Sequence, residues 1–476
     1  MNRRAVSGIL AILLVMGALL LVFNIQLVEA SGTIYIRPDG SVDPPTAPIQ
    51  RDGDHYTLVG NISSDGDGIV IERDNILLDG AGYTLLGIGL PDWGILLGGR
   101  RNVTVRNMKI GAFWGGVFLH ASSETSIVGN HIQHGWQSHT ANYYGIALSY
   151  SDSNTISGND ITANWFDGIY FYGSNYNIIS GNNITANFRC GIRFEAEGHA
   201  TSHNTIYENN LENNDCGICL SEGSSYNTVN ENNLENNNRG IEIFYSSDWN
   251  RICENNMEDS SCAITIHKSS HNAFHHNSLL NNDLQVLLSL SPSNSWDNGY
   301  PSGGNYWSDQ YHGEYADLYH GPNQDRPGGD GIVDAPYVID ENNQDNYPLV
   351  KPPVPPGLSA DLVRRQAWPE HNHFDVSKDE DGYQTLHAKV ENTGNQTMWC
   401  RAVFYITRND GVSTVIESES LFVERDHTVE FSAAFGILTN ADTGRYYVSA
   451  TCEYSHNKIV WGQGEKEKSF KFTVAP

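Results

Sequence analysis

The sequence repeats itself along most of its length. A glycine followed by a β-branched residue recurs at steps of 22 to 29 residues, and the last two members replace the glycine with alanine or glutamine. The ten pairs begin at Gly68, Gly94, Gly116, Gly145, Gly168, Gly191, Gly217, Gly240, Ala263 and Gln285. An internal repeat of this length is typical of a solenoid, in which each unit stacks only on its neighbours.

Each unit contains three short segments in which apolar and polar residues alternate, as they do in strands. No unit has the apolar spacing of a helix, and the leucine spacing of leucine-rich repeats is absent. Two asparagine columns keep the same period: Asn154, Asn177, Asn204, Asn227, Asn250 and Asn272, and Asn159, Asn182, Asn209, Asn232, Asn255 and Asn277. The sequence therefore predicts an all-β right-handed parallel β-helix of about ten coils, stacked about 4.8 Å apart. We expect its asparagines to hydrogen-bond from coil to coil.

Charge and the N-terminus limit where the protein acts and what it binds. The chain has 28 Lys and Arg against 56 Asp and Glu, a formal net charge of −28, so we expect no nucleic acid partner. Two arginines precede an apolar run over residues 9–23, and small residues follow before Ser31, which is typical of a secretory signal. The alternative is an uncleaved anchor, although the run is short for a membrane span. We expect a secreted or cell-surface protein with no membrane span once residues 1–30 are removed.

The repeat motifs resemble the right-handed β-helix family that groups NosD-type and carbohydrate-binding proteins. Residues 74–83 resemble the first coil of exported archaeal members, and residues 303–309, 330–337 and 346–349 resemble their closing segment. The resemblance covers residues 33–350 and implies the fold more specifically than an activity. The family includes copper-delivery accessories, surface proteins and, more distantly, polysaccharide lyases and epimerases.

The repeat gives way to a second domain. We expect the β-helix to occupy residues 31–350, with a closing segment at 291–350, and a polyproline II linker at 351–357. Residues 358–476 carry six or seven short alternating runs separated by turn signals, which predicts an immunoglobulin-like β-sandwich. Cys400 and Cys452 fall on an early and a late strand, where we expect a disulfide between the two sheets. Two buried free thiols are the alternative.

Repeat positions predict surface columns, because equivalent residues of neighbouring coils stack. Cys190 and Cys216 share one position on adjacent coils, which predicts a disulfide, with buried thiols as the alternative. Two outward columns bring six side chains to one sheet face: Tyr170, Tyr172, Arg193, Glu195, Glu242 and Phe244. Aromatic rings stack on pyranose faces and charged groups bind hydroxyls, so these residues predict a carbohydrate-binding groove. An ordinary solvated sheet face is the alternative.

Two acidic sets predict calcium binding. They are Glu208, Glu231 and Glu254, spaced by 23 residues, and Asp325, Asp330 and Asp334 in the closing segment. Clustered carboxylate oxygens suit calcium, whereas a solvent-facing acidic stripe is the alternative. Copper would need clustered Met, Cys or His, and the scattered histidines and few methionines disfavour it. The motifs require no cofactor.

Catalysis would use the same sheet face. A polysaccharide lyase or epimerase needs a base, and a hydrolase needs two carboxylates. Arg193, Glu195 and Glu242 are the catalytic candidates, but no aspartate pair occupies adjacent coils there. We therefore favour an exported protein that is carbohydrate-binding or structural, with a polysaccharide or cell-surface glycan as its partner. The alternatives are a polysaccharide lyase, hydrolase or epimerase, and a NosD-like periplasmic copper-binding accessory protein.

Overall fold

The computed structural model describes most of the chain from residue 32 onward. The described ranges are 32–88, 93–133, 143–196, 198–199, 201–313, 315–353, 360–369, 373–375, 383–392, 398–407, 413–418, 420–423, 428–436, 444–455, 462–463 and 468–475. The predicted signal at residues 1–30 and most of the predicted linker lie outside these ranges. Within them, no helix has the length and apolar character needed to cross a membrane.

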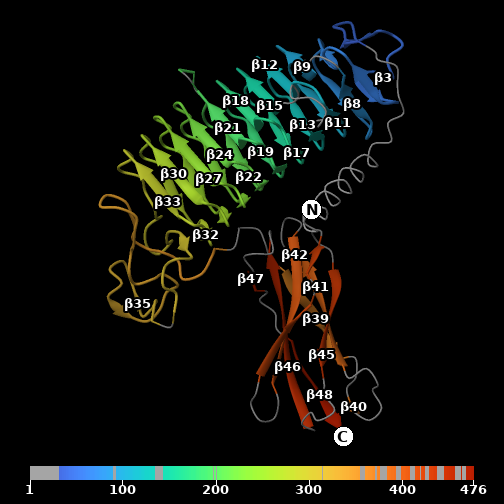
Figure 1. Cartoon of the computed structure of the whole chain (residues 1–476). Helices are drawn as coiled ribbons and strands as arrows, with labels where there is room; N and C mark the ends of the chain where they lie inside the picture. Colours follow the sequence, from blue (N-terminus) through green and yellow to red (C-terminus); the bar gives the residue numbers. More distant parts are fainter. Residues whose placement is uncertain are drawn as a thin grey trace, which may run out of the picture. The chain divides into compact units, whose positions relative to one another are not determined.

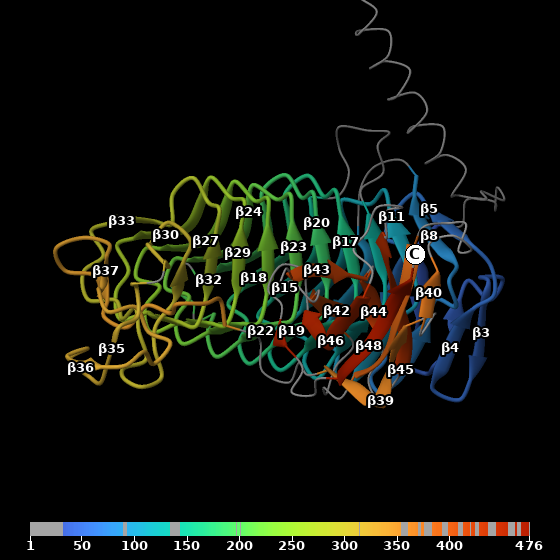
Figure 2. The ribbon, with the colours of Figure 1, turned by 90° about the horizontal axis from the view of Figure 1, so that it is seen from below.

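Three long sheets wind into a β-solenoid of about ten turns over residues 55–289 (Figures 1 and 2). The first sheet contains, in spatial order, β2 (Val42–Asp43), β1 (Ile34–Ile36), β6 (Ile69–Ile71), β9 (Trp93–Gly98), β12 (Gly115–His120), β15 (Tyr144–Ser149), β18 (Asp167–Tyr172), β21 (Cys190–Glu195), β24 (Cys216–Ser221), β27 (Arg239–Phe244), β30 (Cys262–His267) and β33 (Val286–Ser289). The second contains β3 (Ile49–Asp52), β4 (His55–Leu58), β7 (Ile76–Asp79), β10 (Val103–Arg106), β13 (Ser126–Val128), β16 (Thr155–Ser157), β19 (Ile178–Ser180), β22 (Thr205–Tyr207), β25 (Thr228–Asn230), β28 (Arg251–Cys253) and β31 (Ala273–His275). The third contains β34 (Tyr306–Trp307), β32 (Ser278–Leu280), β29 (Asn256–Glu258), β26 (Asn233–Glu235), β23 (Asn210–Glu212), β20 (Asn183–Thr185), β17 (Asp160–Thr162), β14 (His131–Gln133), β11 (Lys109–Gly111), β8 (Thr84–Gly87) and β5 (Ile62–Ser64).

Strands of successive coils pair in the register that the repeat predicts. Ile169 of β18 lies beside Ile192 of β21, which lies beside Ile218 of β24, and all three side chains are fully buried. The intervening positions, such as Tyr170 and Arg193, face outward and are only partly buried. The alternation in the sequence therefore fills the inside of each coil with aliphatic side chains, whose burial stabilises the stack.

The asparagine columns form the predicted ladders inside the solenoid. Between successive coils the Asn159, Asn182 and Asn209 side chains are linked by Nδ2-to-Oδ1 hydrogen bonds of 2.9 and 2.8 Å. The Asn154 column is joined in the same way. A third ladder, which the sequence analysis did not identify, runs through Asn164, Asn187, Asn214 and Asn237. These buried amides satisfy one another and the turn backbone, so the turns repeat without orphaned polar groups.

The segment after the last coil closes the end of the stack around one buried carboxylate. Asp345 Oδ2 accepts hydrogen bonds from the Asn305 backbone N–H at 2.7 Å and from Trp307 Nε1 at 2.9 Å. The Asn305 side chain in turn continues the ladder to Asn277 at 2.9 Å. Two small antiparallel hairpins complete this segment: β35 (Tyr319–His320) with β36 (Arg326–Pro327), and β37 (Tyr337–Val338) with β38 (Gln344–Asp345).

The described residues from Ala360 to Ala475 contain two mainly antiparallel sheets. One has the order β39 (Ala360–Pro369), β41 (Tyr383–Asn392), β45 (Thr428–Gly436). The other has the order β40 (His373–Asp375), β48 (Lys468–Ala475), β46 (Gly444–Ser455), β42 (Met398–Thr407), β43 (Ser413–Glu417), with β44 (Leu421–Val423) beside β42 and β47 (Gly462–Gln463) beside β46. The immunoglobulin-like topology stays a prediction.

The predicted disulfides are corrected by the structure, in which Cys190, Cys216, Cys400 and Cys452 are free thiols. Cys400 and Cys452 lie on adjacent strands of one sheet, because β42 pairs directly with β46 and Cys400 faces Tyr454. A bond between two sheets is therefore wrong for this pair. Cys190 and Cys216 are direct neighbours across β21 and β24, so their predicted register is confirmed although no bond joins them.

Candidate functional site

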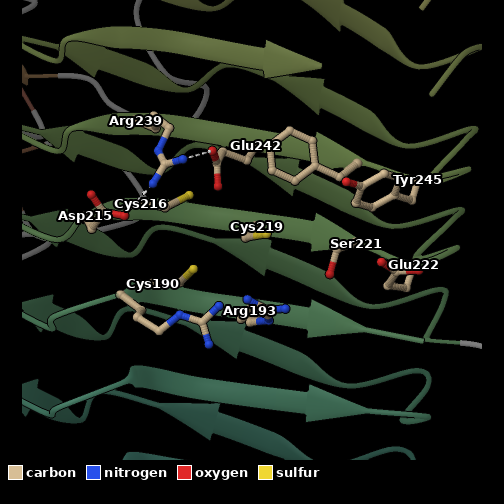
Figure 3. Close-up of a pocket in the computed structure, with 12 residues that line it drawn as sticks. Cys190, Arg193, Asp215, Cys216, Cys219, Ser221, Glu222, Arg239, Glu242 and Tyr245 are labelled. Atoms are coloured by element: carbon tan, nitrogen blue, oxygen red, sulfur yellow. Dashed lines mark hydrogen bonds and ion pairs between the residues drawn. The ribbon is translucent and has the colours of Figure 1, made fainter. Parts of the chain in front are cut away.

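A pocket opens on the outer face of the first sheet, over β21, β24 and β27 (Figure 3). Its volume is about 250 Å³, at the small end for ligand pockets. Its lining is Arg189, Cys190, Arg193, Asp215, Cys216, Cys219, Ser221, Glu222, Arg239, Glu242, Phe244 and Tyr245. The lining contains three basic residues, Arg189, Arg193 and Arg239, and three acidic residues, Asp215, Glu222 and Glu242, so its formal charge is zero in a chain whose net charge is −28.

The pocket lies where the turn before the first sheet changes length. Two residues separate the ladder asparagine Asn187 from the start of β21 at Cys190, whereas one residue separates Asn214 from the start of β24 at Cys216. The ladder continues across this step without a break, with an Nδ2-to-Oδ1 distance of 2.9 Å between Asn187 and Asn214. The shortening therefore changes the outer surface of the turn and leaves the inside of the coils in register.

Arginine–carboxylate pairs hold the polar side chains of the pocket in place. Arg239 lies between Asp215, which its Nη2 contacts, and Glu242, whose Oε1 is 2.7 Å from its Nη1 (Figure 3). Glu242 is only 4% exposed, and burial raises the pKa of its carboxyl while Arg239 opposes that shift. On the next coils, Glu195 Oε2 accepts hydrogen bonds from Arg193 Nε at 3.1 Å and from the Tyr170 hydroxyl at 3.2 Å. The site thus presents fixed donors and acceptors side by side.

The floor of the pocket consists of three thiols. Cys190, Cys216 and Cys219 are 5%, 1% and 3% exposed, and Figure 3 shows their side chains converging between Arg193 and Arg239. Phe244 packs against this cluster. Burial raises the pKa of Cys216 to about 12, so the thiol is protonated at neutral pH and behaves as a small apolar group.

The predicted groove residues gather at this site only in part. Arg193, Glu242 and Phe244 line the pocket, while Tyr170 and Glu195 lie directly beside it. Tyr172 is in register with Glu195, but its ring packs at the side against Tyr150, with the centroids 5.4 Å apart. No observation tests what these residues bind, so their role in binding or catalysis stays a prediction.

Sequence reasoning assigned no site role to seven residues that line the pocket: Arg189, Asp215, Cys219, Ser221, Glu222, Arg239 and Tyr245. Cys219 and Arg239 occupy the predicted columns, because β24 pairs Cys219 with Glu242 and Cys216 with Arg239. Their column positions were therefore the available signal. Arg189 and Asp215 lie in the turns of unequal length, where the period alone does not fix the position of a side chain.

Two of the carboxylates predicted to bind calcium accept hydrogen bonds from backbone amides in the described structure. Asp330 Oδ1 accepts the Ile332 amide at 3.1 Å, and Asp334 Oδ2 accepts the Leu318 amide at 2.9 Å, so both stabilise turns. Glu208 is half-buried, and burial raises the pKa of its carboxyl. Across the described ranges, no group of three or more His, Cys, Asp or Glu is arranged to hold a metal ion. Calcium binding by Glu208, Glu231, Glu254, Asp325, Asp330 and Asp334 stays a prediction.

Comparison with known proteins supports the fold. Residues 93–256 match the family model described as the right-handed beta helix region, and residues 200–313 match the model described as periplasmic copper-binding protein (NosD). No curated protein matches the sequence significantly.

Two solved structures illustrate the likeness. A double mutant of a periplasmic alginate epimerase shares 17% identity and a TM-score of 0.39, covering 53% of this chain and 70% of its own. A DFA-IIIase from Arthrobacter chlorophenolicus A6 in complex with GF2 shares 14% identity and a TM-score of 0.40, covering 50% of this chain and 69% of its own. At these values neither structure carries an argument about what this chain does.

The residues in the second matched range do not fit a copper site. His276 Nε2 donates to the Ser302 carbonyl at 2.7 Å, and the His271 ring stacks on Trp249 with the centroids 4.5 Å apart. Met257 is fully buried in the coil interior. His275 and His276 do meet, with their Nδ1 atoms 3.1 Å apart, but among the described residues they belong to no group of three or more His, Cys, Asp or Glu that could hold a metal ion, and a copper site needs several ligands to converge.

Proposed function

We propose that this protein, whose residues match the right-handed beta helix model over 93–256 and the NosD model over 200–313, is exported and binds a carbohydrate polymer on the outer face of its first sheet. The observation that carries the proposal is the pocket itself, in which aromatic rings flank fixed arginine–carboxylate pairs. Phe244 borders one side, and Tyr170 approaches the other through its hydrogen bond to Glu195. Rings beside preorganised donors and acceptors are the usual means of holding a sugar.

The chemistry of the pocket suits vicinal hydroxyls. The guanidinium groups of Arg193 and Arg239 are fixed by their carboxylates, so a sugar meets planar donors and charged acceptors that need no reordering. The thiol floor and the Phe244 ring offer an apolar surface to the C–H face of a pyranose. A volume of about 250 Å³ suits one sugar residue of a chain that extends beyond the pocket.

A second candidate function, polysaccharide cleavage or epimerisation, is favoured by Glu242. A buried carboxyl with a raised pKa in a pocket has the character of a general acid. Binding is preferred because Arg239 holds this carboxylate in an ion pair, which favours its charged form.

The test is binding of residues 31–476 to a panel of acidic and neutral polysaccharides by affinity electrophoresis, with an assay for new reducing ends and unsaturated products. We expect retardation by at least one polymer, and about a tenfold loss of affinity in Arg193→Ala, consistent with the loss of one charged hydrogen-bonding group. Arg251→Ala, which removes an exposed arginine from the second sheet, is the matched control and should bind like the wild type.

Equal retardation of both variants would remove the pocket from the binding site, and no retardation by any polymer would refute the proposal. Product formation that disappears in Glu242→Gln would establish the enzymatic alternative instead.

A further inference from the structure

A row of partly buried aromatic side chains leads away from the pocket along the edge of the first sheet, where the turns enter its strands. We call Trp114, Tyr143, Tyr144, Phe166 and Tyr170 the aromatic lane; each is half-buried. Their rings touch in sequence, with centroids 5.4 Å apart for Trp114 and Tyr143, 5.0 Å for Tyr143 and Phe166, and 4.9 Å for Tyr144 and Tyr170. The lane therefore crosses the coils of β12, β15 and β18 and reaches β21 at the pocket, about 14 Å along the axis at the usual strand spacing.

Arg189 stands where the lane meets the pocket. Its guanidinium carbon lies 4.9 Å from the centroid of the Phe166 ring, and its side chain lines the pocket. Among the described residues its guanidinium has no hydrogen bond or ion pair, whereas Arg193 and Arg239 are both paired with carboxylates. A guanidinium held on an aromatic ring without an acidic partner is available to an anionic ligand.

Resting on the carbohydrate binding proposed above, we propose that the ligand is an acidic polysaccharide lying along the aromatic lane, parallel to the solenoid axis, with a uronate carboxylate bound by Arg189. A coil spacing of about 4.8 Å is close to the length of one sugar residue, so successive residues meet rings of successive coils. The guanidinium fork matches a carboxylate in two parallel hydrogen bonds.

The acidity of the whole protein does not prevent this contact. The net charge of −28 acts at long range and is screened beyond about 8 Å at physiological ionic strength. Within that distance Arg189 lines the pocket beside three acids: Asp215 and Glu242 are both paired with Arg239, and Glu222 is exposed to solvent. The direct interaction of a ligand carboxylate with Arg189 therefore outweighs its repulsion by the net charge of the protein.

The experiment compares polymers that differ only in charge. Affinity electrophoresis of residues 31–476 uses polygalacturonate and its methyl ester, together with alginate, hyaluronan and neutral glucans. We expect an acidic polymer to bind best and the methyl ester to bind at least tenfold more weakly than polygalacturonate. Arg189→Gln should remove that preference, and Arg189→Lys should retain part of it.

Variants of the lane separate stacking from charge. Tyr144→Ala should weaken binding of acidic polymer and ester alike by about fivefold, which corresponds to the loss of about 1 kcal/mol from one ring contact. Tyr226→Ala removes an exposed ring that stacks on His203 in another column and should change nothing. Melting temperatures of all variants identify any loss that comes from unfolding.

The outcomes distinguish this inference from the proposed function. Binding only to neutral polymers, equal binding of acid and ester, or an unchanged preference in Arg189→Gln overturns the acidic ligand and leaves carbohydrate binding in place. Unchanged affinity in Tyr144→Ala overturns the aromatic lane. Binding to no polymer refutes both proposals together.

Discussion

Replacing Asn182 with alanine should destabilise the solenoid far more than the same change one residue later. The Asn182 side chain is 1% exposed and occupies the middle of the Asn159 ladder. It donates to the Ile156 carbonyl at 2.9 Å, the Ser180 carbonyl at 3.1 Å and Asn209 Oδ1 at 2.8 Å. It also accepts from the Asn159 backbone N–H at 3.0 Å and from Asn159 Nδ2 at 2.9 Å.

The loss of unfolding free energy in Asn182→Ala can be estimated from the buried polar groups that lose a hydrogen-bond partner. The Asn159 backbone N–H loses its side-chain acceptor inside the coil, and an unsatisfied buried donor costs about 1–3 kcal/mol. The Asn159 and Asn209 amides keep their hydrogen bonds to the Ile127 and Ile179 carbonyls, so the penalty at those groups is smaller. With the void left by the amide, we expect a loss of roughly 3 kcal/mol, which lowers the melting temperature by about 5–10 °C.

Asn183→Ala is the matched control. Asn183 is exposed, and its side chain hydrogen-bonds Asp160 at 3.0 Å and Asn210 at 2.9 Å where water can replace it. We expect a change below about 0.5 kcal/mol. Thermal melts followed by circular dichroism measure both variants. Equal melting temperatures for Asn182→Ala and the wild type would refute the view that the ladder stabilises the stack.

Three further predictions concern titration and reactivity. The hydrogen bond to Asp160 raises the pKa of His131 above its ordinary value, so the pair stabilises the fold below about pH 6.5 and this stabilisation is lost as pH rises through the raised pKa. His131→Gln should therefore lower the melting temperature more at pH 5.5 than at pH 8.5, and an equal drop at both pH values would contradict this. Burial raises the pKa of Asp345 to about 7, so the folded protein binds more protons than the unfolded protein between about pH 4 and pH 7. The free energy of unfolding should therefore fall as pH rises across that window. Denaturant titrations at several pH values should show a smaller dependence of this free energy on pH in Asp345→Asn. The pocket thiols should resist iodoacetamide at pH 7 in the native protein and react after denaturation, since Cys216 is buried and its pKa is about 12; mass spectrometry of native Cys216 carrying the label would contradict its burial.

The fold could be predicted because one short period governs both the inside and the turns. Each coil has an aliphatic residue such as Ile192 that points inward and an asparagine such as Asn182 at one turn position. An ambiguous assignment of strands in one coil is therefore resolved by the equivalent residues of the other coils. The strands from β39 to β48 offer no such redundancy. Alternation there predicts strands but not which strands are neighbours, so it cannot place Cys400 and Cys452 on one sheet or two, and the structure shows β42 and β46 to be adjacent.

The residues of the candidate site that lie on the strands could be predicted from the repeat period, whereas those in turns of unequal length could not. Arg193 and Glu242 were predicted to share one column, and the strand register confirms that placement, with Cys219 between them. Arg189 and Asp215 belong to turns that differ by one residue, so their placement depends on how the chain closes each coil. The column argument is therefore least informative at the place where the surface becomes concave.

This departure from the period explains how a regular solenoid acquires a pocket while its interior ladder stays intact. The third ladder passes the step at 2.9 Å between Asn187 and Asn214 and at 3.1 Å between Asn214 and Asn237. The hydrogen bonds and aliphatic layers inside the coils therefore stay the same whether one or two residues separate the ladder asparagine from the next strand. A turn shortened by one residue brings Asp215 where the neighbouring coil has the longer Phe188–Arg189 segment, and the long side chains of Arg189 and Arg239 are left to border the gap. In a fold whose core repeats every coil, a binding surface is most readily built by changing turn length and outward columns, because neither disturbs the stacked interior.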